Sequence, residues 1–119
     1  MTEGIVSFSD WSKLDLRTGK ILKVEDIEGA DKLYKLSIDL GKELGKRTLV
    51  AGIKKHYTKE QLKNTKCIVF TNLEPRMLKG VESQGMILAA VSQNKNGEET
   101  VRIIQPDADA DIELGSRIR

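Results

Sequence analysis

The chain has 119 residues, of which 39% are apolar and 32% are charged, and its formal net charge is +2. This length suits one globular domain with its own core, and no stretch approaches the roughly 18 consecutive apolar residues of a membrane helix. The single cysteine, Cys67, excludes an internal disulfide framework, and residues 1–10 lack the apolar core of a signal peptide, so we expect a cytoplasmic protein.

The first half of the chain predicts a short helix and three strands. The helix is expected over residues 9–14, and a strand over 16–27 follows it. The clearest alternation of apolar and polar residues extends from residue 34 to residue 40. Its apolar positions are Tyr34, Leu36, Ile38 and Leu40. This alternation predicts a strand with one buried face. A turn bracketed by Gly41 and Gly45 then leads to a strand over 47–52.

The second half predicts one better-defined helix and three further strand runs. Thr58 and Gln61 fit a capping box, with Tyr57 and Leu62 placed as a hydrophobic staple, so a helix is expected over 59–63. The strand runs cover 66–72, 86–92 and 100–105, and Asn96-Gly97 marks a hairpin before the last run. Tyr34, Phe70 and Met86 are expected in the core.

Five main strands with a helix between the third and the fourth follow the order of an oligonucleotide-binding (OB) barrel. We therefore expect an all-β, five-stranded OB barrel with a C-terminal extension; another small β-barrel or sandwich fits the same period. The whole chain, 1–119, is expected to be one domain, with an N-terminal segment over 1–14 and the extension over 93–119.

Catalytic and metal-binding chemistry is not expected. The only histidine, His56, and the only cysteine, Cys67, fall on different predicted elements. Cys67 lies within an apolar run, which is typical of a buried structural thiol. There is no phosphate-binding glycine loop, and Asp107, Asp109 and Asp111 lack the glycine and glutamate of a calcium loop. We therefore expect no enzyme, no metal site and no cofactor.

Charge is segregated along the chain. Residues 42–79 contain ten Lys or Arg against three acidic residues, a net charge of +7, whereas residues 1–41 carry −2 and residues 80–119 carry −3. A nearly neutral chain can thereby present a basic face to a polyanion, although a merely solvated charged surface explains the same pattern.

Five strings in order resemble the tRNA-binding domain family, and together they cover most of residues 8–92. They lie at residues 15–21 (DLRTGKI), 30–34 (ADKLY), 47–53 (RTLVAGI), 57–62 (YTKEQL) and 72–86 (NLEPRMLKGVESQGM). This family includes a free-standing structure-specific tRNA-binding protein and the C-terminal domain of many methionyl-tRNA synthetases. Its fold is an OB barrel. The loop of the family that reads Pro-Arg-Lys-Leu-Arg-Gly has one fewer basic residue here, at residues 75–80.

The resemblance implies a non-catalytic protein that binds tRNA, with a β-subunit-like role beside methionyl-tRNA synthetase as one expectation. With only 4% aromatic residues there are few platforms for stacked bases, which favours recognition of RNA shape and backbone. The RNA-binding residues are expected to be Lys32, Lys54, Lys55, Asn72, Arg76, Lys79 and Ser83. For Asn72 and Ser83, bracing of the loop is an equal alternative.

Two other functions stay open. A related branch of the family resembles a secretion chaperone that binds unfolded polypeptide, which an apolar groove would favour. A pure assembly module for synthetases is the other. The extension is expected to build a homodimer, because its apolar residues exceed what one small barrel covers; alternatively they close the barrel. These residues are Val101, Ile103, Ile104, Ile112, Leu114 and Ile118.

Overall fold

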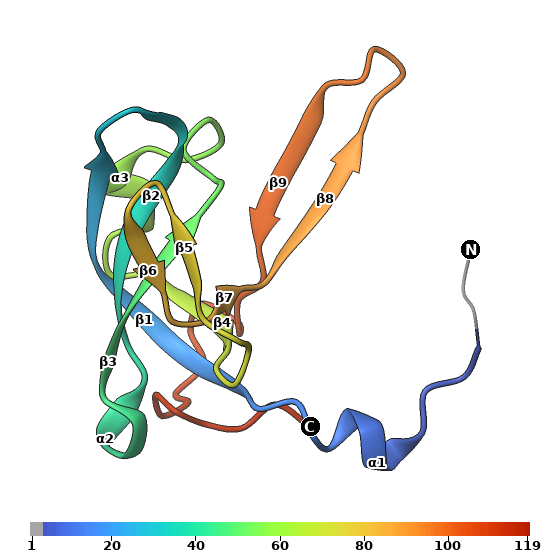
Figure 1. Ribbon diagram of the computed structural model, residues 1–119. Coiled ribbons are helices and arrows are strands. Elements are labelled where there is room, and N and C mark those ends of the chain that lie inside the picture. Colours follow the sequence, from blue (N-terminus) through green and yellow to red (C-terminus); the bar gives the residue numbers. More distant parts are fainter. Residues whose placement is uncertain (1–3) are drawn as a thin grey trace.

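The computed structural model describes residues 4–119 and is built almost entirely from antiparallel strands (Figure 1). The main sheet has five strands in the order β3-β2-β1-β4-β7, and two separate hairpins, β5–β6 and β8–β9, accompany it. The elements are α1 (Phe8–Trp11), β1 (Leu16–Ile27), β2 (Ala30–Asp39), α2 (Gly41–Leu44), β3 (Lys46–Ala51), α3 (Lys59–Leu62), β4 (Lys66–Phe70), β5 (Arg76–Leu78), β6 (Val81–Ser83), β7 (Met86–Ile87), β8 (Ala89–Gln93) and β9 (Glu99–Ile103).

Strand β1 organises the main sheet because it pairs with β2 along one part and with β4 along another. The register slips between Ile21 and Lys23, a bulge that adds curvature. At Gly19 a side chain has no room, since a Cβ atom there would come within 2.8 Å of Cγ2 of Ile38. The expected OB-type arrangement is thus confirmed at the level of an all-β fold with short helices and a five-stranded antiparallel sheet.

The core lies on the inner face of this sheet. Leu36, Ile38 and Leu40 are fully buried, as the period of two over residues 34–40 predicts. Tyr34 is also buried, but Phe70 is only half-buried. Helix α3 closes the core with Leu62, and its capping box is present: Thr58 and Gln61 each accept a backbone N–H of the other.

The C-terminal segment returns to β1 and is fastened there. Thr18, which is 1% exposed, donates its hydroxyl to the carbonyl of Glu113, and the backbone N–H groups of Gly115 and Ser116 donate to Thr18 O and Oγ1. Arg17 donates to the Gly115 carbonyl at 3.0 Å and to the Asp15 carboxylate at 2.6 Å. That bond from Arg17 lowers the pKa of Asp15. The segment is therefore part of the folded body.

Two features of the segment from β7 to β9 differ from what the sequence predicts. The run 86–92 is interrupted at Leu88, so that β7 pairs with β4 whereas β8 pairs with β9. Met86 is 43% exposed, so its expected place in the core is wrong. The unbroken apolar run from Met86 to Val91 carries no period that could reveal the break.

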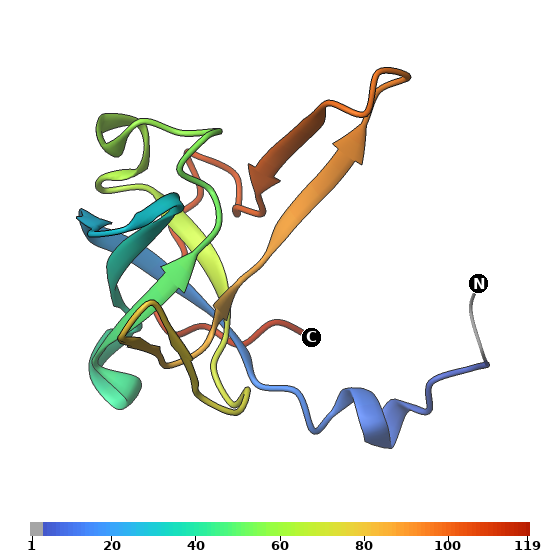
Figure 2. The same cartoon turned by 45° about the horizontal axis from the view of Figure 1, so that its top comes forward.

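The hairpin β5–β6 was expected only as a loop. It has three residues in each strand and lies against the main sheet, where Leu78 and Val81 pack on Ile27, Ala30 and Val50. By contrast, β8–β9 and the N-terminal segment with α1 both project away from the main sheet, which Figures 1 and 2 show from two directions. The predicted helix at 9–14 begins and ends earlier, at Phe8 and Trp11. Among residues 4–119, no helix is long and apolar enough to cross a membrane.

Candidate nucleic-acid interface

Three connections gather at one end of the main sheet, and a lysine that the sequence singled out lies in or close to each of them. Lys32 follows the β1–β2 turn, Lys55 lies in the β3–α3 loop and Lys79 lies in the β5–β6 turn (Figure 1). The N–H of Lys54 donates to the carbonyl of Lys32 at 3.3 Å, which holds the first two turns together. We call Lys32, Lys55 and Lys79 the basic end; all three are exposed.

The turn that presents Lys79 has an unusual backbone. Lys79 and Gly80 have φ angles of 51° and 81°, and positive values at both central residues are those of a type I′ hairpin turn. Because Leu78 and Val81 pack beside Ile27 and Ala30, this turn is fixed next to the β1–β2 turn. The apolar contacts of the hairpin therefore position a cation that points into solvent.

Arg76 belongs to the same hairpin but lies at its open end, where it pairs with Ser83. Arg76 is exposed and lines a cavity of about 310 Å³ between β3 and β8–β9. It does not flank the turn together with Lys79. None of the four cations Lys32, Lys55, Arg76 and Lys79 forms an ion pair with a residue of the described chain, so their charge is available to an anionic ligand.

Lys54 differs from these four because it is paired. Its Nζ lies 3.0 Å from Oδ1 of Asp26, and Nζ of Lys59 lies 2.7 Å from Oδ2 of the same carboxylate. The hydrogen bonds from Lys59 and then Lys54 hold the pKa of Asp26 below its ordinary value, and the Asp26 carboxylate raises the pKa of Lys59. Lys54 also lies 6.0 Å from the centre of the Tyr34 ring. Its charge is partly neutralised and its position is fixed.

Asn72 and Ser83 use their side chains within the protein. Asn72 accepts from the N–H of Asp15 at 2.8 Å and donates to the carbonyl of Lys13 at 2.7 Å. Ser83 is buried; its hydroxyl accepts from the N–H of Val50 and donates to the carbonyl of Gly85. The alternative of loop bracing therefore describes both residues, and RNA contact through Asn72 remains only a prediction.

Sequence reasoning missed the residues that face the basic end across a cavity of about 640 Å³. Lys32, Lys55 and His56 line one side of it, and Gln93, Glu98 and Glu99 of the β8–β9 hairpin line the other. The Asn96-Gly97 signal locates the turn of this hairpin. No local signal in the sequence could show that the hairpin projects far enough to leave a cavity beside the loop at Lys55.

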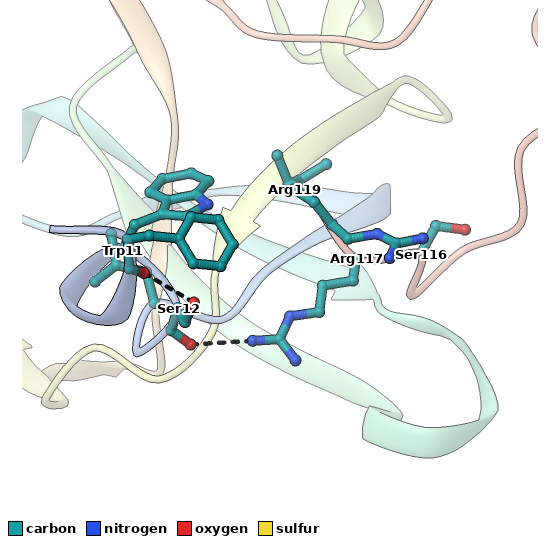
Figure 3. A pocket seen from close by; sticks show the side chains of 8 residues that line it. Trp11, Ser12, Ser116, Arg117 and Arg119 are labelled. Atoms are coloured by element: carbon teal, nitrogen blue, oxygen red, sulfur yellow. Dashed lines mark hydrogen bonds between the residues drawn. The ribbon is translucent and has the colours of Figure 1, made fainter.

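A third cavity, of about 750 Å³, lies between the N-terminal segment and the C-terminal segment (Figure 3). Trp11 and Ser12 are on one side of it and Ser116, Arg117 and Arg119 on the other, joined by a hydrogen bond from Arg117 to the Ser12 carbonyl at 3.2 Å. The neighbouring residues Ile5, Val6 and Phe8 are 100%, 72% and 79% exposed. This N-terminal segment leaves more apolar surface uncovered than any part of the C-terminal segment.

The described part of the chain has neither a reactive thiol nor a group of metal ligands. Cys67 is buried, and burial raises the pKa of its thiol to about 12, so the nucleophilic thiolate is scarce at neutral pH. Among the described residues, no three His, Cys, Asp or Glu side chains are grouped so that they could hold a metal ion. The exposed cations point to binding of an anion instead.

Known proteins resemble this chain closely. The model of a family described as "putative tRNA binding domain" matches residues 16–117. A methionine–tRNA ligase of Pyrococcus horikoshii is 51% identical over 114 residues, which are 96% of this chain but only 14% of the ligase.

Two solved structures show the same fold. A MetRS-related protein from Pyrococcus horikoshii superposes with a TM-score of 0.82 at 31% identity, covering 98% of this chain and 99% of that one. The CsaA chaperone protein from Picrophilus torridus has a TM-score of 0.82 at 32% identity, covering 97% and 100%. Relatives of both kinds therefore match this chain over nearly its full length.

Proposed function

Since the chain belongs to the putative tRNA-binding domain family, we propose that it is a non-catalytic protein that binds tRNA through its basic end and Arg76. The observation that carries the proposal is the set of four exposed cations that have no carboxylate partner within residues 4–119, three of them on or beside turns at one end of the sheet. Lysine and arginine on rigidly held turns can follow a phosphate backbone while the fold remains unchanged. Recognition would then depend on the shape and backbone of the RNA more than on its bases.

The ion pairs of Asp26 give a first test. Asp26→Asn removes the carboxylate that neutralises Lys54 and Lys59, so both lysines become available to phosphates. We expect tRNA affinity at low salt to rise about 3-fold, and the slope of log affinity against log salt to steepen by about 0.7–0.9 for each lysine recruited. The measurement is a tRNA titration by fluorescence anisotropy, with Asp109→Asn as a charge-matched control, since Asp109 forms no ion pair within residues 4–119. An unchanged affinity and slope would show that Lys54 and Lys59 do not contact RNA.

A homodimer is also part of the proposal, although its apolar contacts would come from a different set of residues than the sequence suggested. Val101 and Ile103 are buried in the core, so they close the protein's own fold. Ile104 and Ile112 are 43% and 39% exposed, and the N-terminal segment adds Phe8. If these exposed apolar side chains lie together, they would favour burial against a second copy of the chain. The extension 93–119 together with the N-terminal segment is therefore our candidate interface.

Light scattering tests the dimer directly. The full-length protein is expected to be dimeric at micromolar concentration, and Phe8→Ser combined with Ile112→Ser is expected to weaken the dimer at least 10-fold, since about 1.5–3 kcal/mol accompanies burial of one large apolar side chain. Met77→Ser, which changes an apolar side chain on β5 that is 65% exposed, serves as the control. A wild-type protein that is monomeric at this concentration would contradict the dimer.

A second candidate function, binding of unfolded polypeptide, is supported by one observation. The cavity of about 310 Å³ is lined mainly by apolar residues of β3, β7, β8 and β9, with Arg76 at its edge. Such a surface suits an extended apolar peptide. A role in the cytoplasm as a β-subunit-like partner of methionyl-tRNA synthetase is a further proposal. A pure assembly module would instead capture a synthetase and show no affinity for RNA.

A further inference from the structure

One edge of β3 is closed by side chains instead of by a strand. β3 stands at the end of the strand order of the main sheet, so β2 covers only one of its two edges. On the other edge, the N–H of Thr48 donates to the side-chain Oε1 of Gln84 at 3.0 Å. The N–H of Val50 donates to the hydroxyl of Ser83 at 2.9 Å. Backbone groups that a strand edge would leave unpaired are thereby satisfied.

Gln84 replaces a strand residue at this edge. Its own N–H donates to the carbonyl of Thr48 at 2.9 Å, while its side-chain oxygen accepts the N–H of Thr48. The two bonds reproduce those that opposite residues exchange in a hydrogen-bonded pair of an antiparallel sheet. This arrangement needs only an acceptor oxygen at the end of the side chain.

Arg47, the residue before Thr48, joins both ends of the segment that carries the β5–β6 hairpin. Its Nη1 donates to the carbonyl of Thr71, just after β4, at 2.6 Å and to the carbonyl of Gln84, shortly before β7, at 3.4 Å. Thr71 is buried and Arg47 is half-buried. We call Arg47, Ser83 and Gln84 the edge clasp. It holds the base of the hairpin segment on β3.

The position of the hairpin depends on the edge clasp, because within the described chain the hairpin pairs with no strand of the main sheet. It has three residues in each strand, and an isolated two-stranded hairpin is marginally stable in water. Leu78 and Val81 anchor it near its turn. The edge clasp anchors its open end, where Arg76 pairs with Ser83.

We propose that Arg47 and Gln84 are positioning residues. They hold the β5–β6 hairpin on the edge of β3 and thereby set how strongly Arg76 and Lys79 bind RNA, without contacting RNA themselves. The proposal rests on the proposed function, because it assigns the two residues a role in placing its cations. Arg47 is one of the ten cations of residues 42–79, but its guanidinium is engaged with two carbonyl oxygens. Its role is therefore to fix the hairpin and not to bind phosphate.

Hydrogen exchange of the full-length protein, followed by nuclear magnetic resonance, tests the edge clasp without RNA. Gln84→Met keeps the length of the side chain and removes its acceptor, so the Thr48 amide is expected to exchange about 5- to 10-fold faster. The amide signals of Arg76 and Ser83, the pair at the open end of the hairpin, are expected to shift. Gln84→Glu keeps an acceptor oxygen and should hold the exchange of Thr48 within about 2-fold of the wild type. Unchanged exchange and signals in Gln84→Met would overturn the proposal.

A double-mutant cycle with tRNA then separates positioning from contact. Gln84→Met is expected to weaken tRNA binding about 3-fold in the wild-type protein, but less than about 1.5-fold when Arg76 and Lys79 are already alanine, because positioning acts only through those two cations. Arg47→Lys keeps the charge but loses the planar fork that reaches two carbonyls, and it should behave in the same way.

The matched control is Gln105→Met, which removes one bond from a glutamine side chain to the carbonyl of Lys66, away from the hairpin, and should leave tRNA affinity unchanged. If Gln84→Met costs the same affinity in both backgrounds, Gln84 contacts RNA itself, and the positioning role is wrong while the proposed function stands. If the wild-type protein binds no tRNA at low salt, the proposed function fails and the positioning role falls with it, whatever the exchange of Thr48 shows.

Discussion

Replacing both Arg76 and Lys79 by alanine is expected to weaken tRNA binding about 10-fold or more, since a hydrogen bond to a charged group contributes about 1.5–3 kcal/mol. The two cations lie at opposite ends of the β5–β6 hairpin, so they would contact different phosphates and their effects should nearly add. Neither side chain forms an ion pair within residues 4–119, so their removal should leave the fold intact.

The control for this variant is the replacement of Lys42 and Lys46 by alanine. Both are exposed and lie in the same basic segment of the chain, but α2 and the start of β3 are at the end of the main sheet opposite the basic end (Figure 1). This control removes the same net charge and should change affinity only slightly. Equal losses in the two double variants would mean that the overall charge, and not the hairpin, governs RNA binding. Thermal unfolding would verify that each variant is folded.

Gly115→Ala is expected to lower the stability of the fold strongly. Gly115 has a φ angle of +85°, and a Cβ atom there would lie 2.5 Å from the carbonyl oxygen of Leu40. A left-handed backbone costs a side-chain-bearing residue roughly 1–2 kcal/mol, and the clash with a backbone oxygen adds to this. The hydrogen bonds of Gly115 to Thr18 and Arg17 would then be strained. We expect a loss of at least about 3 kcal/mol in the free energy of unfolding.

Gly29→Ala separates backbone strain from the clash. Gly29 has a φ angle of +79°, but no atom lies within 4 Å of the position its Cβ would take. This variant should therefore lose only the roughly 1–2 kcal/mol of the left-handed conformation. Urea unfolding of the two variants measures the difference. Equal losses would mean that the C-terminal segment adjusts around Gly115, and that its attachment to β1 is weaker than its hydrogen bonds indicate.

The sequence predicts those parts of the fold whose signals are local. The alternation around Leu36 and Ile38 and the capping box of Thr58 and Gln61 each depend on neighbouring residues, and the structure confirms both. The hairpin β5–β6 escaped prediction because three residues per strand are too few to show a period. The break at Leu88 escaped because a wholly apolar run has no alternation.

For the candidate site, the sequence identifies cations but not how they are arranged. Lys32, Lys55 and Lys79 were expected on loops that connect strands. Lys32 lies instead at the start of β2, and the three residues come to one end of the sheet through pairing between distant strands. The ion pair between Lys54 and Asp26 depends on contacts between β1 and the β3–α3 loop. No spacing in the sequence reveals these contacts.

The salt dependence of tRNA binding tests the central claim most directly. If Lys32, Lys55, Arg76 and Lys79 contact phosphates, each neutralised phosphate contributes about 0.7–0.9 to the slope, so log affinity against log salt should fall with a slope of about −3 to −4. Binding of an unfolded polypeptide to an apolar groove would instead change little with salt, or tighten under salting-out conditions. The measurement is a titration of the wild-type protein with tRNA at several potassium chloride concentrations, repeated with an unfolded polypeptide. Steep salt dependence with tRNA would support the account, whereas weak and salt-insensitive tRNA binding beside tight polypeptide binding would contradict it.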